Sequence, residues 1–145
     1  MYPIYIRDLE NTGLKEETGL YPLSPAISLT LPTPPGANRL WRSYQGRTVK
    51  SPLARAWQAQ AALLAKANGI QQAHGAVALA IVLHPRQTKS GQASKVRLDV
   101  DAPIKATLDA LQGVAYADDK QVIRVSSEIG YPLPDGGITV TVQQL

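Results

Sequence analysis

Four stretches of this 145-residue chain have the spacing of hydrophobic residues that is typical of β-strands. Apolar and polar residues alternate over residues 27–31, which indicates a half-buried strand. Residues 77–83 are apolar on both faces, so we expect a central strand that is covered on both sides. Two more strands are predicted over about residues 121–129 and 138–142, joined by a turn-rich segment.

Two helices are predicted from apolar residues at helical spacing. The first begins at Ser51, a natural N-cap, with Pro52 in the first helical position, and Asn68 and Gly69 close it. Its predicted apolar face consists of Leu53, Trp57, Ala61 and Leu64. The second helix is predicted over about residues 101–112. It is expected to bury Ile104, Leu108 and Leu111.

The resulting element order is β-α-β-α-β-β. We therefore expect one α/β (α+β) domain over residues 26–145, with the helices packed on a small mixed sheet. Residues 1–25 contain four acids, two bases and several Gly and Pro breakers, without a sustained hydrophobic period. They are predicted to form an N-terminal arm or a partly ordered lead-in.

Composition narrows the class of protein. The chain has no cysteine, which excludes disulfides, zinc ribbons and thiol catalysis and favours a reducing compartment. The longest apolar run, residues 76–83, is too short to span a bilayer, and the N-terminal residues lack the apolar segment of a signal peptide. No glycine-rich loop followed by Lys-Ser or Lys-Thr is present, so no nucleotide cofactor is expected. We therefore expect a cytoplasmic protein that does not enter the membrane.

Charge is unevenly distributed along the chain. The formal net charge is +4, yet all eleven acids lie before Thr18 or from Asp99 onward. The intervening residues contain ten bases, namely Arg39, Arg42, Arg47, Lys50, Arg55, Lys66, Arg86, Lys89, Lys95 and Arg97. Surfaces without a polyanionic partner usually intersperse both signs, so this segregation predicts a face that binds nucleic acid. The alternative is an accident of composition in a stretch rich in Ala and Gln.

Two carboxylates, Asp99 and Asp101, lie two residues apart. In extended backbone this spacing places both side chains on one face, roughly 6 to 7 Å apart. Such a pair repels unless a cation lies between the two groups, and oxygen-rich sites of this kind suit Mg²⁺ or Mn²⁺. Asp119 follows after one short helix and a tight return, so it can come back beside the same strand end. The alternative role for Asp101 is a helix N-cap.

Three ordered motifs around these acids resemble the signature of the RusA family of Holliday-junction resolvases. The motifs are residues 97–105 (RLDVDAPIK), 108–111 (LDAL) and 116–122 (YADDKQV), preceded by residues 31–35 (LPTPP), 38–39 (NR) and 46–47 (GR). The resemblance covers about residues 26–145. Because three blocks occur in the right order at compatible spacing, the resemblance is far more specific than a single Asp-x-Asp.

The resemblance assigns roles to particular residues. It implies that Asp99, Asp101 and Asp119 bind Mg²⁺, with Mn²⁺ as a substitute. Asp118 matches the first member of the family's acid pair and is a candidate further ligand. Lys105 matches the family's important lysine, which would stabilise developing negative charge on phosphoryl oxygens. The bound cation would polarise the phosphate and activate a water molecule for attack.

The implied activity is Mg²⁺-dependent hydrolysis of phosphodiester bonds in branched DNA, above all four-way junctions, during recombination and repair. A junction must be cut on two strands symmetrically, so a two-fold homodimer is expected. One position departs from the family pattern, because Ala102 stands where the family usually has Asn. This departure puts in doubt any polar support that the position gives to the metal site or to the DNA.

The predicted DNA contacts lie in two polar, basic segments, about residues 38–50 and 85–97. They are Asn38, Arg39, Arg42, Arg47, Lys50, Arg86, Lys89, Lys95 and Arg97. Trp41 and Tyr44 lie among the first group and either stack on unpaired bases or pack under the loop. The only two histidines, His74 and His84, are expected to be structural.

Each site residue also has a simpler interpretation. Lys105 can be a rung in a ladder with Asp101 and Asp109 on a solvated helix face. Asp118 and Asp119 can be ordinary turn residues before a strand. Two other functions compete with the nuclease: a catalytically inactive dimer that binds branched DNA, and a glycosyltransferase that uses Asp-x-Asp to hold a metal. The second needs a larger nucleotide-binding domain than 145 residues allow.

Overall fold

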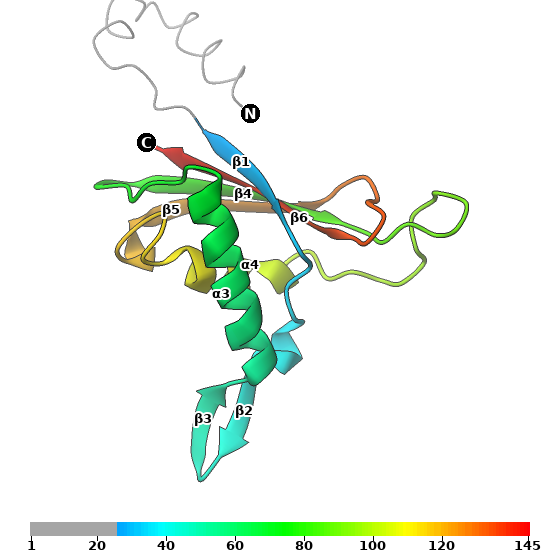
Figure 1. The fold of residues 1–145 in the computed structure, drawn as a ribbon, viewed down its shortest axis with the longest axis horizontal. Helices are drawn as coiled ribbons and strands as arrows, with labels where there is room; N and C mark the ends of the chain where they lie inside the picture. Colours follow the sequence, from blue (N-terminus) through cyan, green and yellow to red (C-terminus); the bar gives the residue numbers. More distant parts are fainter. Residues whose placement is uncertain (1–25) are drawn as a thin grey trace, which may run out of the picture.

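A four-stranded mixed sheet with the strand order β1-β6-β4-β5 forms one layer of the protein. In the computed structural model, which describes residues 26–145, its strands are β1 (Ile27–Leu31), β4 (Val77–His84), β5 (Val122–Ile129) and β6 (Gly137–Gln144) (Figure 1). Strands β4 and β5 are parallel and the other pairs are antiparallel. The predicted strands and the α+β class are confirmed. The predicted arm at residues 1–25 lies outside the described residues.

Two helices, α3 (Pro52–Ala67) and α4 (Ala102–Leu111), form the second layer. The predicted cap of α3 is confirmed, since Ser51 Oγ accepts a hydrogen bond of 3.1 Å from the Ala54 backbone nitrogen. The predicted apolar face needs a correction at each end, because Leu53 is 48% exposed and Leu64 is only half-buried. The buried stripe consists of Ala54, Trp57, Ala61 and Ala65. It begins one residue later than predicted and then follows the helical period without interruption.

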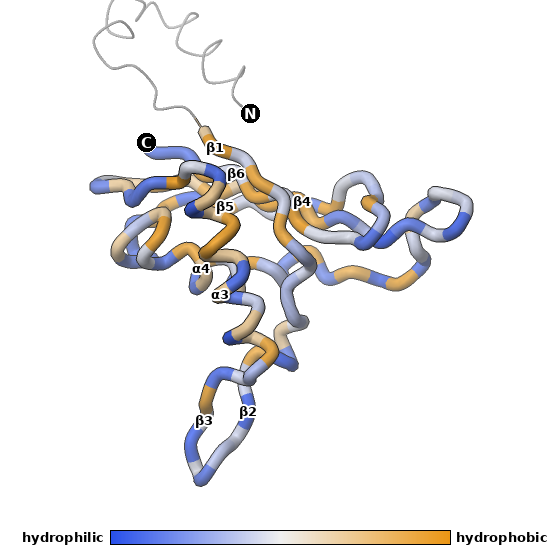
Figure 2. Tube along the Cα trace, in the orientation of Figure 1, coloured by the Kyte–Doolittle hydropathy of each residue, from blue (hydrophilic) through white to orange (hydrophobic). Residues whose placement is uncertain are grey.

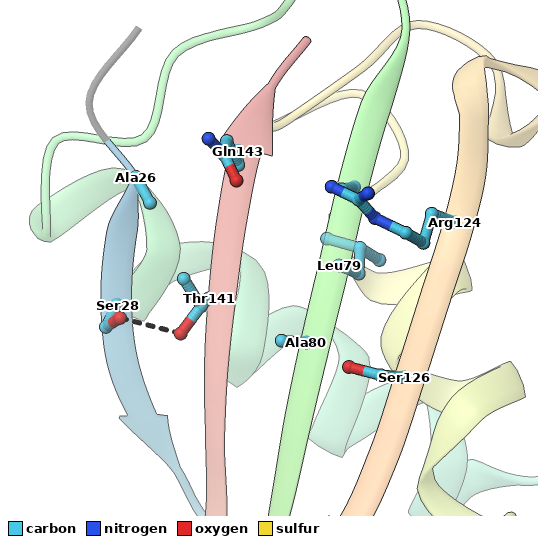
Figure 3. A pocket seen from close by; sticks show the side chains of 9 residues that line it. Ala26, Ser28, Leu79, Ala80, Arg124, Ser126, Thr141 and Gln143 are labelled. Carbon is cyan, nitrogen blue, oxygen red and sulfur yellow. Dashed lines mark hydrogen bonds between the residues drawn. The ribbon is translucent and has the colours of Figure 1, made fainter. Parts of the chain in front are cut away.

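The expectation that β4 is covered on both sides is wrong within residues 26–145. Leu79, Ile81 and Leu83 point into the core, and both helices lie on that face of the sheet (Figure 1). The opposite face carries Ala80 and a pocket of about 310 Å³. The pocket lies across all four strands among small and polar side chains (Figure 3). The β4 residues on this face, Ala78, Ala80 and Val82, are small or of moderate size and none is exposed, so the face leaves little apolar surface for a covering layer to bury.

A hairpin, β2 (Trp41–Tyr44) with β3 (Arg47–Lys50), replaces the basic loop expected between residues 38 and 50. Its two-residue turn, Gln45 and Gly46, has φ angles of 50° and 71°, as a type I′ turn requires. Including this hairpin and two short 3₁₀ helices, η1 (Ala37–Arg39) and η2 (Asp119–Gln121), the element order is longer than predicted. The hairpin is mostly hydrophilic and projects from the N-terminal end of α3 (Figures 1 and 2).

Ser51 joins the hairpin to α3. Besides capping the helix, its hydroxyl donates a hydrogen bond of 2.6 Å to the Arg39 carbonyl. Its backbone nitrogen donates one of 2.8 Å to the Leu40 carbonyl. A single buried residue therefore holds the chain on both sides of β2 and β3.

His84 is buried at the end of β4, and both of its ring nitrogens have hydrogen-bond partners within the fold. Its Nδ1 lies 2.8 Å from the Tyr131 carbonyl oxygen and its Nε2 lies 2.7 Å from Thr139 Oγ1. The expected structural role of this histidine is thus confirmed. In the described part of the chain, none of the helices has the length and apolarity needed to cross a membrane.

Replacing Gly137 with alanine is expected to lower the free energy of unfolding by about 2 kcal/mol or more. Its φ angle is 135°, and an added Cβ would lie 2.8 Å from the Leu31 carbonyl oxygen. Chemical denaturation monitored by circular dichroism measures the effect. Gly36→Ala is the control, because a Cβ there meets nothing within 4 Å. Equal unfolding midpoints for the two variants would contradict the expectation.

Candidate active site

Asp99 and Asp101 lie in a turn that leads directly into α4. The Ala102 nitrogen donates to the Asp99 carbonyl at 3.1 Å, and the Ile104 nitrogen donates to the Asp101 carbonyl at 3.1 Å. The extended geometry considered for this segment is therefore wrong, because hydrogen bonding across the turn gives Asp101 helical dihedral angles of −88° and −13°. The turn is held against the sheet by a hydrogen bond from the Ser127 hydroxyl on β5 to the Val100 carbonyl.

The carboxylates of this turn are accessible. Both Asp99 and Asp101 are exposed. Asp101 occupies the N-cap position of α4, as the alternative interpretation proposed, but its side chain makes no capping hydrogen bond. Helix capping therefore does not consume this carboxylate, and it stays available to a ligand.

Lys105 lies one helical turn beyond Asp101 and pairs with Asp109. The two side chains form an ion pair of 2.8 Å, so one rung of the simple ladder is present. The hydrogen bond to Asp109 is the main cause that raises the pKa of Lys105, partial burial opposes it, and the charges of Asp109 and Asp119 add to the rise. Lys105 is therefore a persistent cation whose side chain is still 54% exposed.

Asp109 also connects α4 to the hairpin and to α3. The Lys50 ammonium, at the end of β3, lies 3.5 Å from the Asp109 carboxylate. The same ammonium donates to Gln58 Oε1 at 2.8 Å, and Gln58 Nε2 donates to the Asp109 carbonyl at 3.1 Å. Sequence reasoning left Asp109 in a surface ladder and did not identify Gln58. Asp109 contacts Lys50 and Gln58 across separations of 59 and 51 positions in the sequence, which local spacing does not reveal.

Asp118 and Asp119, the acid pair before β5, have different environments. Asp118 caps η2, since its carboxylate accepts a hydrogen bond of 2.9 Å from the Lys120 backbone nitrogen. This bond lowers the pKa of Asp118. Asp118 therefore has the turn role that the simpler interpretation gave it. Asp119 is half-buried, and its charge acts on both Lys105 and Tyr116.

Tyr116 is a further residue of this region that sequence reasoning did not single out. Its ring is completely buried, and its hydroxyl donates a hydrogen bond of 2.7 Å to the Leu108 carbonyl. Burial, followed by the charges of Asp119 and Asp109, raises the pKa of Tyr116 well above its usual value. The neutral hydroxyl thus ties the segment that carries Asp119 to the middle of α4. Its position beside the acid pair in residues 116–122 was the available sequence signal.

Around α4 the structure therefore brings Lys105, Asp109 and Asp119 into one electrostatic group, with Asp99 and Asp101 at the start of the helix. Within residues 26–145, no three carboxylate, imidazole or thiolate residues are grouped so that they could hold a metal ion by themselves. This arrangement fits Mg²⁺, which usually binds through one or two carboxylates together with substrate phosphates and water. Asp99 and Asp101, both exposed and in one turn, supply two such carboxylates, whereas the implied set of Asp99, Asp101 and Asp119 does not form a group of three.

The predicted DNA contacts lie on two arms of the molecule (Figure 1). Arg42, Arg47 and Lys50 belong to the hairpin, and Asn38 and Arg39 to η1 beside it. The other four lie in the long connection between β4 and α4, namely Arg86, Lys89, Lys95 and Arg97. All nine are exposed except Lys50, which is half-buried. The bases are thus accessible to a polyanion, and they are spread over the surface rather than gathered in one patch.

Comparison with protein families finds a match over most of the chain. The family model described as Endodeoxyribonuclease RusA matches residues 32–143, which include α4, both acidic segments and the hairpin. Comparison with curated proteins gives no match. Since the family match spans most of the chain, the protein belongs to the RusA family of endodeoxyribonucleases.

Proposed function

We propose that this protein is a structure-selective endodeoxyribonuclease that resolves four-way DNA junctions by Mg²⁺-dependent hydrolysis, in DNA recombination and repair. The observation that carries the proposal is the exposed turn with Asp99 and Asp101 at the start of the helix that presents Lys105. Two carboxylates that can bind a metal ion, followed by the positively charged Lys105, suit a reaction in which negative charge develops on phosphoryl oxygens. Such an enzyme would work in the cytoplasm, where it meets DNA.

Asp99 and Asp101 would hold Mg²⁺ or its substitute Mn²⁺ together with substrate phosphates and water. Asp119, the third ligand that the resemblance implies, is not grouped with them in the structure and acts on Lys105 through its charge. Once bound, the cation neutralises phosphate charge and makes a water molecule more acidic. Asp118 is left as the cap of η2. Carboxylate oxygens are the preferred ligands of these hard cations, and the chain has no cysteine to offer a competing thiolate.

Lys105 would contact the phosphate that is cut. Its ammonium is already oriented by Asp109 and carries its charge across the neutral pH range. A phosphate oxygen can share the exposed ammonium without displacing Asp109, because a lysine has three donor hydrogens. Charge that is fixed before the reaction stabilises a developing oxyanion without costly reorganisation.

A homodimer would supply two such sites to the two strands that must be cut. The two basic arms of each protomer would follow the phosphates of the junction, because phosphate contacts fix the position of a protein on DNA without reading its sequence. Two-fold symmetry in the protein matches the approximate two-fold symmetry of the cleavage itself.

The direct test uses an end-labelled four-way junction and a linear duplex of the same sequence, each with Mg²⁺ and with EDTA. Paired symmetric nicks in the junction alone, lost in EDTA, are the expected result. Tight junction binding without cutting in Mg²⁺ or Mn²⁺ would instead identify a catalytically inactive dimer. In that event Ala102→Asn tests whether restoring the family's usual residue restores cleavage.

Replacing Arg47 with alanine is expected to weaken junction binding and to reduce its dependence on salt. Arg47 lies at the exposed tip of the hairpin, where one lost phosphate contact lowers the slope of log K against log salt by about one unit. Affinity measured at several salt concentrations gives the slope. The matched control is Arg55→Ala on the exposed side of α3. An unchanged slope for Arg47→Ala would place the hairpin away from the DNA.

A further inference from the structure

An open cleft of about 370 Å³ lies between the foot of the hairpin and α4. The hairpin contributes Trp41 and Lys50, and the helices contribute the remaining wall. The full lining is Trp41, Lys50, Gln58, Lys105, Asp109 and Gln112. The cleft therefore extends from the proposed catalytic lysine to the hairpin, and its volume is in the range of small-molecule sites.

Trp41 gives this cleft an apolar surface in reach of solvent. The residue is 46% exposed, whereas the second tryptophan, Trp57, is 7% exposed and donates its indole hydrogen to the Pro32 carbonyl at 3.0 Å. The Lys50 ammonium lies 5.7 Å from the centre of the Trp41 ring. The earlier alternative, in which Trp41 packs under a loop, does not apply. The indole instead stands beside a cation at the rim of the cleft.

Hairpin register separates Trp41 from Tyr44, the other aromatic residue of the hairpin. Trp41 pairs with Lys50, and Tyr44 pairs with Arg47. Residues three positions apart on a strand point to opposite faces, so Tyr44 lies on the face away from Trp41. Consistent with this, the Tyr44 ring has a cation–π contact on its own face, where the Arg42 guanidinium lies 5.4 Å from the centre of the ring. Only Trp41 of this pair lines the cleft.

We propose that this cleft is a nucleotide subsite, in which an unpaired base beside the cut phosphate stacks on Trp41 while Lys50 and Lys105 contact its phosphate. The inference rests on the proposed function. An indole next to two ammonium groups matches a nucleotide, which combines a flat ring with an anionic phosphate. Asp109 also lines the cleft, but two lysines neutralise it and leave the group cationic.

An unpaired base suits the site better than a base within a duplex. The face of a stacked base pair is covered by its neighbours, whereas a base at a branch point can leave the stack at low cost. The subsite would therefore favour branched over linear DNA without reading base identity. It would also place the strand at Lys105, since the indole and that lysine line the same cleft.

The test uses the intrinsic fluorescence of tryptophan. The full-length protein is titrated in EDTA with a four-way junction and with a linear duplex of the same sequence. We expect the junction to quench the fluorescence more strongly than the duplex, because only the junction offers an unpaired base that can stack on Trp41. Trp57 is buried and should contribute little to the change. Trp41→Phe should lose this difference in signal but keep its affinity, since phenylalanine still stacks on a base.

Trp41→Ala should bind the junction about tenfold more weakly, because it loses one stacked base, and should bind the duplex almost normally. Tyr44→Ala is the matched control on the opposite hairpin face and should keep the preference for the junction. Equal quenching by both DNAs, or a normal affinity of Trp41→Ala for the junction, would overturn the subsite.

These outcomes are separable from those of the proposed function. Cleavage by the wild type together with normal binding by Trp41→Ala would overturn the subsite and leave the nuclease intact. Junction-specific quenching without any cleavage in Mg²⁺ or Mn²⁺ would support the subsite and overturn the nuclease.

Discussion

Asp101→Asn is expected to reduce junction cleavage on the order of a thousandfold while junction binding is preserved. The change removes a candidate cation ligand and one negative charge near the phosphates. It leaves the fold intact, because the Asp101 side chain is exposed and makes no capping hydrogen bond. Single-turnover cleavage of an end-labelled junction gives the rate, and a gel-shift titration in EDTA gives the affinity.

The matched control is Asp135→Asn, which removes the same charge from an exposed turn between β5 and β6. It should cut at the rate of the wild type. Normal cleavage by Asp101→Asn would show that the turn before α4 is not the metal site. Loss of cleavage together with a lowered unfolding midpoint would assign Asp101 to the fold instead.

Lys105→Ala is expected to lower the cleavage rate about a hundredfold or more, because one preorganised charge is removed from the phosphoryl oxygens. Binding should change little, since the hairpin and the β4–α4 connection supply most of the basic residues. Lys105→Arg should recover part of the rate by restoring the charge. Lys66→Ala, in the last turn of α3, is the control for loss of an exposed lysine. A normal rate for Lys105→Ala would exclude it from the reaction.

The pH dependence of the cleavage rate is a second test of the role of Lys105. Hydrogen bonding to Asp109 raises the pKa of Lys105, so the lysine stays charged throughout the neutral and mildly alkaline range. Its contribution should be constant from about pH 6 to pH 9 and should be lost only as the pH rises through the raised pKa. Asp109→Asn should shift that alkaline loss to lower pH. An unaltered alkaline limb would show that another group controls it.

The regular elements could be predicted because burial imposes a period on the sequence. The strands β1 and β6 carry an alternating hydrophobic pattern that matches their burial, and in α3 the predicted period is right although its two ends are displaced by one residue. The β2–β3 hairpin has no buried residue. It therefore has no apolar alternation to detect, and the informative signal was Gly46 in a two-residue turn. Apolar residues on both faces of β4 indicated a second covering layer, but Ala78, Ala80 and Val82 leave little apolar surface for one to bury.

In the site, too, contacts within one helix could be predicted from the sequence, whereas contacts between separate elements could not. Four-residue spacing was enough to predict that Lys105 pairs with Asp109, because helix geometry fixes that distance. The approach of Lys50 to Asp109 depends on how the hairpin packs against α4, and no spacing encodes it. Two-residue spacing of Asp99 and Asp101 does not determine backbone conformation either. Pro103, in the first turn of α4, was the signal that a helix rather than a strand follows Asp101.

The hydrogen bonds of Ser51 give the hairpin a mechanical property. Since the Ser51 hydroxyl both donates to the Arg39 carbonyl and caps α3, a change in the angle of the hairpin would have to break one of these hydrogen bonds or move the first turn of the helix. These bonds restrain the angle between the hairpin and α3 in the protein without DNA. In the proposed function, a hairpin held in this way would favour DNA whose shape already fits it, because a preorganised surface loses little conformational freedom on binding.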